Sequence, residues 1–202
     1  MPDWDEDSPE LRQNLDSILE EITTRAEQRE TPTVELARRW QRRLMQDLHI
    51  EPRYVGAFRG EPGFERIGVR IGAYMGTPPT RVAEDLKEFE GTLQQLVSEL
   101  DKTLPIGKKL TPDECDAVID LCAWAHAKWI RIHPFANGNG RTARLWANFL
   151  LVRYGLPPFI RLRPRPRDGY EQAGAQAMQG NWEPTATVFR RALKRFLDEA
   201  AD

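Results

Sequence analysis

The sequence predicts an all-α fold with one small β-hairpin. Three observations support this class: apolar residues recur every three or four positions over most of the chain, a helix-capping sequence stands at residues 111–114, and only one short region alternates like paired strands. The 202 residues, 40% hydrophobic and 30% charged, suit one globular domain or one domain with an arm. No apolar run approaches the roughly 20 residues that a membrane-spanning helix needs.

The N-terminal part is predicted to be an acidic arm, residues 1–30, ahead of a main domain at residues 31–202. The arm holds ten Asp or Glu residues against three Arg, although the whole chain has a formal net charge of only −2. That balance gives no support to direct nucleic-acid binding. Residues 1–12 are expected to be frayed. A short helix is predicted over residues 13–29 from the helical spacing of Leu15, Ile18, Leu19, Ile22 and Ala26.

A second helix is predicted to begin at Thr31-Pro32-Thr33, because proline suits the first helical turn. In residues 52–80 the helical pattern gives way to strand-like segments. Residues 54–58 and 67–71 are strand-like, and residues 59–63 supply glycine and proline between them. This pattern predicts a hairpin with a long tip. Thr80 opens the next helix, which is predicted to reach about Leu100.

Two apolar helices are predicted at the centre of the core. The first begins at Thr111, with Pro112 in its first turn, and runs to about Arg131. The second carries Leu145, Trp146, Phe149, Leu150 and Val152. It ends at Tyr154-Gly155, and two prolines prevent its continuation. Helices near residues 170–179 and 185–200 complete the chain.

Several isolated features have ordinary structural interpretations. Cys115 and Cys122 are expected to be reduced core residues, and the start of the chain lacks the regions of a signal peptide, so we expect a cytoplasmic protein. His126, on an apolar helix, is interpreted as a core histidine. The basic stretch at residues 161–167 is either a phosphate-facing edge or, as is more common for such stretches, a solvated loop stiffened by proline.

The stretch HPFANGNGRTAR, which starts at His133, concentrates the chemistry of the chain between the two central helices. Gly138 and Gly140 let the backbone approach an anion at a helix start, where N–H groups are unpaired. Arg141 and Arg144 share one side of the following helix and suit phosphate oxygens. His133 can accept a proton near neutral pH. The stretch therefore predicts a base beside a polyphosphate cradle.

Taken singly, each part of this stretch is commonly structural. A histidine before proline often ends a helix, Gly-x-Gly is common in turns, and an arginine pair usually lies on a solvated face. Their combination within twelve residues favours a functional site. Phosphoryl-type transfer usually uses Mg²⁺ to neutralise charge, and Asn137 offers an amide oxygen to that ion, although a carboxylate would be a stronger ligand.

The same stretch resembles the signature of Fic-domain proteins, HPFx(D/E)GNGRxxR, and matches it everywhere except at Asn137. The motif is long and specific, and the wider plan resembles the family over roughly residues 33–197. The resemblance implies a Fic-type helical bundle with a small β-hairpin, called the flap, ahead of the motif. It also implies a protein adenylyltransferase, which moves AMP from ATP to a Ser, Thr or Tyr hydroxyl of a target protein.

The resemblance assigns roles to individual residues. His133 is implied to be the catalytic base, and Phe135 to anchor the turn in the core. In the family the position of Asn137 is acidic and binds Mg²⁺. The flap, here about residues 57–72, is implied to align a segment of the target protein by strand addition. The residues implied to bind the nucleotide are Phe135, Asn137, Gly138, Asn139, Gly140, Arg141 and Arg144.

Many Fic proteins are restrained by a helix with the pattern (S/T)xxxE(G/N), whose Glu pairs with the second motif arginine. Two stretches of the first predicted helix approach this pattern without matching it. One hypothesis is that Glu21 or Glu27 reaches Arg144 and obstructs the γ-phosphate. An ordinary amphipathic helix is the favoured interpretation, and a separate antitoxin chain is another source of restraint.

Two alternatives to AMP transfer stay open at the level of sequence. Asn137 favours a non-catalytic nucleotide-binding or interaction module. A Fic relative that transfers another phosphate-containing group is the other alternative, although the GNGR portion from which kinase-like relatives depart is intact here. Roles as a toxin, an effector or a regulator are all compatible with either activity.

Overall fold

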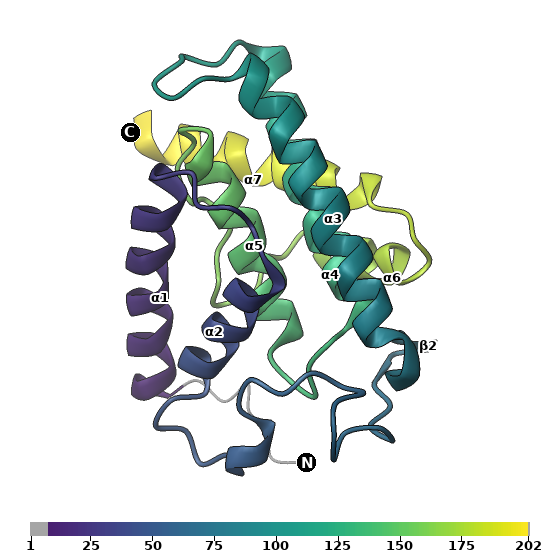
Figure 1. Cartoon of the computed structure of the whole chain (residues 1–202). Helices are drawn as coiled ribbons and strands as arrows, with labels where there is room; N and C mark the ends of the chain where they lie inside the picture. The colour runs from purple at the N-terminus through teal and green to yellow at the C-terminus, as the bar shows by residue number, and fades with distance from the viewer. Residues whose placement is uncertain (1–7, 202) are drawn as a thin grey trace.

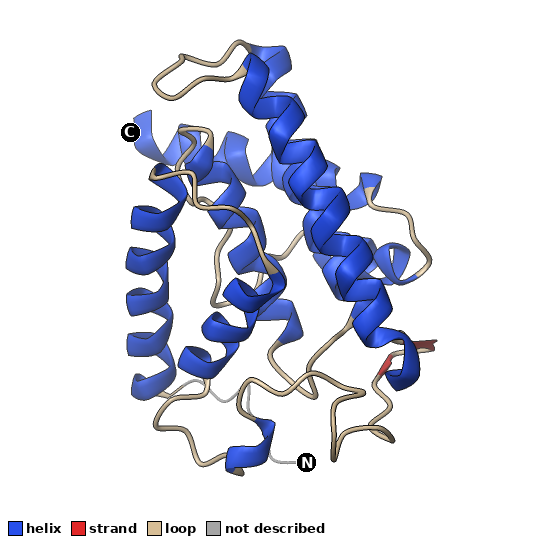
Figure 2. Ribbon diagram, viewed as in Figure 1, coloured by secondary structure: helices blue, strands red, loops and turns tan. Residues whose placement is uncertain are grey.

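A computed structural model describes residues 8–201, and these form seven α-helices and one two-stranded antiparallel hairpin (Figures 1 and 2). The predicted all-α class is confirmed. No helix in this range is long and apolar enough to cross a membrane. The elements are α1 (Pro9–Glu27), α2 (Val34–Leu44), a 3-10 turn (Pro52–Tyr54), β1 (Arg70–Ile71), β2 (Tyr74–Met75), α3 (Pro79–Thr103), α4 (Pro112–Ile132), α5 (Asn139–Arg153), α6 (Tyr170–Met178) and α7 (Glu183–Ala201).

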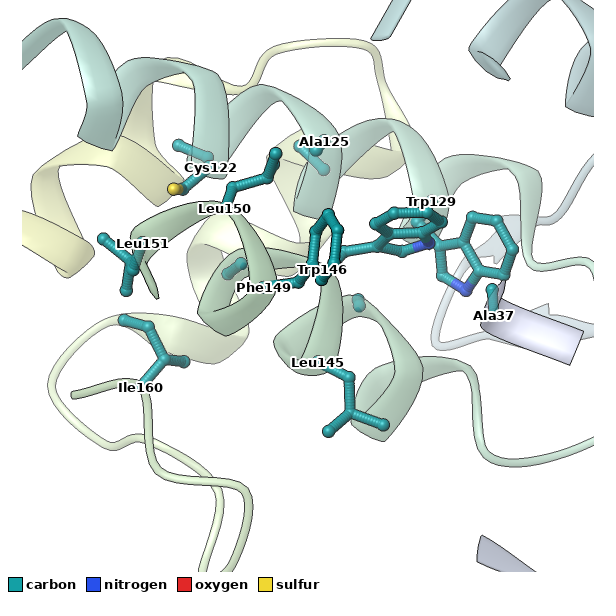
Figure 3. Close-up of a cluster of buried hydrophobic side chains, with 14 of the residues drawn as sticks. Ala37, Cys122, Ala125, Trp129, Leu145, Trp146, Phe149, Leu150, Leu151 and Ile160 are labelled. Carbon is teal, nitrogen blue, oxygen red and sulfur yellow. The ribbon is translucent and has the colours of Figure 1, made fainter. Parts of the chain in front are cut away.

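The core is built around α5, which is buried along nearly its whole length. α4 packs along α5, α1 and α2 lie against α5 on other sides, and α7 packs on α4 (Figure 1). Trp146 of α5 and Trp129 of α4 lie together in this core, with ring centroids 6.0 Å apart (Figure 3). The Trp146 ring centroid also lies 4.8 Å from that of Trp40 of α2 and 5.7 Å from that of Phe89 of α3. These large rings bury much apolar surface, so they hold four helices around one centre.

The first helix begins earlier than the sequence suggests. The Ser8 hydroxyl caps α1 by accepting the Leu11 N–H at 3.1 Å, and Pro9 occupies the first helical position. Residues 9–12 are therefore helical rather than frayed, while residues 1–7 lie outside the described range. Leu11 is fully buried, and the apolar side of α1 contributes to the same core as α2 and α5.

The predicted hairpin is wrong in its first strand and in the position of its tip. Residues 54–58 contain the end of a 3-10 turn, and Phe58 makes an isolated bridge to Phe135 instead of pairing with residues 67–71. The Glu61 carboxylate accepts the Phe58 N–H at 3.0 Å and pairs with Arg38 at 2.6 Å, which folds this segment onto α2. The true hairpin pairs β1 with β2, so the chain reverses after Ile71.

Asn148 fixes the loop that follows α5. Its buried amide donates to the Ile160 carbonyl at 2.8 Å and accepts the Ile160 N–H at 3.1 Å. Replacing Asn148 by Ala leaves both main-chain groups without this partner, so we expect the free energy of unfolding to fall by about 2 kcal/mol. Urea denaturation measures this change. Gln172→Ala, which removes an exposed amide from α6, is the matched control and should change stability by less than about 0.5 kcal/mol.

Candidate active site

His133 ends α4 and is held in a left-handed backbone conformation, with φ 53° and ψ 56°. Its Nδ1 lies 3.0 Å from the carbonyl oxygen of Ile130. A carbonyl only accepts, so Nδ1 carries the proton and the neutral ring keeps its lone pair on Nε2. Burial lowers the pKa of His133 to about 4, against the effect of the Ile130 carbonyl, and the positive charge of Arg59 lowers it further. At neutral pH, His133 is therefore an unprotonated base.

Arg59 holds the backbone of this base in place. The sequence places it at the exposed tip of a hairpin, but its side chain is only 1% exposed. Nε donates to the His133 carbonyl at 2.7 Å, and Nη2 donates to the carbonyls of Ile132 at 2.9 Å and Thr77 at 2.8 Å. Nη1 donates to the Ile67 carbonyl at 3.1 Å. One guanidinium thus joins the segments on both sides of the β1–β2 hairpin to the end of α4.

The turn between α4 and α5 is closed by side chains of the motif. The Asn139 amide accepts the Phe135 N–H at 2.9 Å and donates to the Phe135 carbonyl at 2.8 Å. Phe135 is fully buried against Phe58 and does not line the cleft described below. Gly138 caps α5 with φ 86°, and a Cβ there would stand 3.0 Å from the Met45 side chain. The side chains of Phe135 and Asn139 therefore shape the turn and leave anion contacts to its backbone.

Arg144 belongs to a hydrogen-bond network that includes His126, the predicted core histidine. Its Nη2 donates to the Leu162 carbonyl at 2.9 Å, and its Nη1 donates to the Tyr170 hydroxyl at 3.2 Å. The Tyr170 oxygen lies 2.7 Å from Nε2 of His126. Burial, with a smaller effect from the charge of Arg144, lowers the pKa of His126 to about 3, so its ring is neutral and shares one hydrogen bond with the Tyr170 hydroxyl. Tyr170 therefore orients Arg144 from the buried side.

Tyr170 and Leu162 border a cleft of about 860 Å³, a size that suits a nucleotide-like ligand. It brings together His133, the motif residues 136–141 and Arg144. Sequence reasoning missed Arg12 of α1, which lines the cleft from a distant part of the chain. The basic loop contributes Arg163 and Arg165, so the phosphate-facing interpretation of residues 161–167 is the one that the geometry favours. The sequence signal for this edge was the run of arginines itself.

The model of the Fic/DOC family matches residues 31–151, which run from just before α2 to near the end of α5, the helix that follows the motif turn. This span is more than half of the chain and contains the flap, the base and the anion cradle. The chain belongs to the Fic/DOC family. The predicted family is therefore confirmed.

Several relatives of this Fic domain are named as enzymes. A protein adenylyltransferase Fic from Culex quinquefasciatus is 31% identical over 150 residues, which cover 74% of this chain and 26% of the relative. The protein adenylyltransferase Fic from Nematostella vectensis is 41% identical over 80 residues, which cover 40% of this chain and 18% of the relative. The chain thus spans about a quarter or less of the length of these relatives.

Solved structures match the fold of this Fic domain. A Fic-domain-containing signalling protein from Bacteroides thetaiotaomicron superposes with a TM-score of 0.57 at 26% identity, covering 83% of this chain and 53% of that one. Fic-1 from C. elegans superposes with a TM-score of 0.63 at 24% identity, covering 92% of this chain and 48% of that one. These matches support the Fic-type helical bundle.

The magnesium ion that the family implies does not fit the residues of this cleft. Asn137 stands where a Fic protein carries its acidic ligand, but its Oδ1 accepts the Gly138 N–H at 2.5 Å and lies 3.4 Å from Arg141 Nη2. No Asp or Glu among residues 8–201 lines the cleft. In the same range, no three His, Cys, Asp or Glu side chains form a group that could hold a metal. Hard cations prefer carboxylate oxygens, and residues 8–201 supply none to these walls.

The two glutamates considered as inhibitory residues are not brought to Arg144. Glu21 pairs with Arg25 at 2.7 Å and with Arg43 at 2.6 Å. Glu27 is exposed and borders a separate hollow beside residues 104–110. The part of α1 that lines the cleft lies near the helix start and presents Arg12. The structure therefore supports the ordinary amphipathic interpretation of α1.

Proposed function

We propose that this Fic domain transfers AMP from ATP to a Ser, Thr or Tyr hydroxyl of a target protein, with His133 as the general base. The observation that carries the proposal is a neutral imidazole at the edge of an arginine-lined cleft, with its lone pair on Nε2. Relatives named protein adenylyltransferase support it. Because the chain spans only part of those relatives, the activity is proposed for the Fic domain alone.

In the proposed reaction, Nε2 of His133 takes the proton of the target hydroxyl, and that oxygen attacks the α-phosphorus of ATP. The bond from the α-phosphorus to the bridging oxygen breaks, and pyrophosphate leaves. First-turn N–H groups of α5 and the guanidinium groups of Arg141 and Arg144 would hold the phosphates. Positioned charges of this kind stabilise the negative charge that develops on the leaving group.

We also propose that the target segment docks on the β1–β2 hairpin. Gly76 follows β2 and packs directly on the base, since a Cβ on Gly76 would stand 3.0 Å from Cβ of His133. The Gly76 N–H donates to the Val69 carbonyl at 3.0 Å, which extends the ladder toward the active site. A segment added to this hairpin would receive main-chain hydrogen bonds and lie close to Nε2.

The lowered pKa of His133 predicts activity that extends into acid. Burial disfavours the imidazolium, so the free enzyme should lose kcat/KM only as the pH falls through about 4, below the ordinary histidine value. In the ATP complex, phosphate charge favours the imidazolium, so kcat should fall at a higher pH than kcat/KM does. Initial rates from pH 3.5 to 8, with circular dichroism to identify acid unfolding, measure both limbs. An acid limb of kcat/KM near 6.5 would contradict the buried base.

The target is sought by incubating the protein with ATP and a cell lysate and analysing modified proteins by mass spectrometry. The proposal predicts AMP adducts on hydroxyl side chains that disappear when the protein is left out. Phosphate adducts would instead indicate a kinase-like relative, and adducts of another nucleotide would indicate a different donor. Nucleotide binding without any adduct, also in an Asn137→Asp variant, would favour a non-catalytic binding module.

A further inference from the structure

We propose that Tyr170, supported by His126, is a positioning residue that sets Arg144 for the outer phosphates of the nucleotide, so that the cleft selects a triphosphate over a monophosphate. The inference rests on the proposed function for the class of ligand and adds two residues that lie outside the motif. Tyr170 is the first residue of α6, and His126 is a buried residue of α4.

The guanidinium of Arg144 is held by two neutral oxygens. Nη2 donates to the Leu162 carbonyl at 2.9 Å, and Nη1 donates to the Tyr170 hydroxyl at 3.2 Å. A guanidinium carries five N–H donors, so further donors remain for a ligand. Nη1 also faces the first turn of α5, since a Cβ on Gly140 would stand 3.5 Å from it. The same nitrogen thus lies between the Tyr170 hydroxyl and the turn proposed to hold the phosphates.

The Tyr170 hydroxyl is itself held from the protein interior. Its oxygen lies 2.7 Å from Nε2 of His126, and either direction of that hydrogen bond fixes the oxygen. His126 is 1% exposed, and its ring packs against Phe189 of α7 with ring centroids 5.4 Å apart. Residues of α4, α6 and α7 therefore determine where the tyrosine oxygen stands, and a side chain held by such a network has little freedom to move.

The place of Arg144 in the cleft indicates which phosphates depend on this network. The proposed attack puts the α-phosphate beside Nε2 of His133, at the end of α4. Arg144 lies in the second turn of α5, at the wall that Leu162 and Tyr170 form, so it is available to the phosphates beyond the α-phosphate. An arginine that is already positioned loses less conformational freedom when it binds them. AMP has no such phosphates, so its binding should not depend on Tyr170.

The test is the affinity of Tyr170→Phe, which keeps the ring and removes only the hydroxyl, for two ligands measured by calorimetry. The ligands are AMP and α,β-methylene-ATP, which cannot release pyrophosphate. Compared with the unchanged protein, we expect the analogue to bind about tenfold more weakly and the AMP affinity to change by less than about twofold. Tyr154→Phe is the matched control. It removes a buried hydroxyl that lies 3.1 Å from Asp101, away from the cleft, and should leave both affinities unchanged.

A double-mutant cycle with Arg144→Met tests whether the hydroxyl acts through Arg144. In the Arg144→Met background, Tyr170→Phe should weaken binding of the analogue no further. Equal losses in the two backgrounds would mean that the hydroxyl contacts the ligand directly, which would overturn the positioning role. His126→Phe keeps the hydroxyl but removes its inner partner, so it should weaken the analogue about threefold and leave AMP unchanged. This variant decides the question if circular dichroism shows that Tyr170→Phe does not fold.

Unchanged binding of the analogue by folded Tyr170→Phe, or equal weakening of the analogue and AMP, would overturn the inference while leaving AMP transfer intact. If the unchanged protein bound neither ligand, the proposed function would fail as well.

Discussion

His133→Ala is expected to lower kcat for AMP transfer by about 100- to 10,000-fold, the range that a positioned general base contributes. The structure gives the physical reason: Nδ1 is held by the Ile130 carbonyl, and burial keeps the ring neutral, so Nε2 is ready to take a proton. The arginines and the first turn of α5 remain after this change. Binding of ATP should therefore change by less than about threefold. Single-turnover transfer and calorimetry of ATP binding measure the two quantities separately.

His49→Ala is the matched control for this change. His49 is exposed and lies outside the cleft, so its removal should leave both kcat and ATP affinity unchanged. If His133→Ala retained more than about a tenth of the normal kcat, His133 would not be the base. If it lost ATP binding to the same extent as kcat, the imidazole would serve the phosphate site instead.

Arg59→Met is expected to damage both stability and activity, although Arg59 has no contact with the cleft. The change removes four hydrogen bonds to main-chain carbonyls, one of them fully buried, which predicts a loss on the order of 4 kcal/mol in the free energy of unfolding. It also frees the carbonyl of His133 from the flap. A displacement of the base by about 1 Å can cost about 100-fold in rate, so Arg59 is expected to act as a positioning residue.

The pH profile separates this role from a general loss of stability. The charge of Arg59 lowers the pKa of His133, so Arg59→Met should move the acid limb of kcat/KM to higher pH. Arg59→Lys keeps the charge but replaces the planar fork with a single ammonium, so the limb should stay in place while the rate still falls. Normal kcat in folded Arg59→Met, with only a lowered urea midpoint, would limit Arg59 to a structural role.

The helical core could be predicted from the sequence because its signals are local. The capping box of Thr111 and Glu114 and the apolar pattern that follows it lie within the helix they describe, and α4 begins and ends close to the predicted residues. The flap could not be predicted in the same way. Phe58 bridges to Phe135 across a large separation in sequence, and the buried position of Arg59 depends on carbonyls of α4. Tertiary contacts there override the alternation that suggests a strand.

In the candidate site, too, the residues that are local in sequence could be predicted and those brought in by tertiary packing could not. Its motif residues are contiguous in sequence, so the base and the cradle could be recognised from the chain alone. Arg12 and Tyr170 reach the cleft from α1 and α6, and only the packing of those helices brings them to it. The orientation of the Asn137 amide also depends on folding, because Arg141 lies one helical turn away and faces the same oxygen. Sequence reasoning identified this position as unusual but could not show where its oxygen points.

The position of the label that moves from ATP to protein tests the central claim most directly. The measurement compares ATP labelled at the α-phosphate with ATP labelled at the γ-phosphate, using the unchanged protein and the same target mixture. Attack on the α-phosphorus predicts that protein becomes labelled from α-labelled ATP only, and that the γ-label leaves with pyrophosphate. Protein labelled from the γ-phosphate, or from neither, would contradict AMP transfer by this Fic domain.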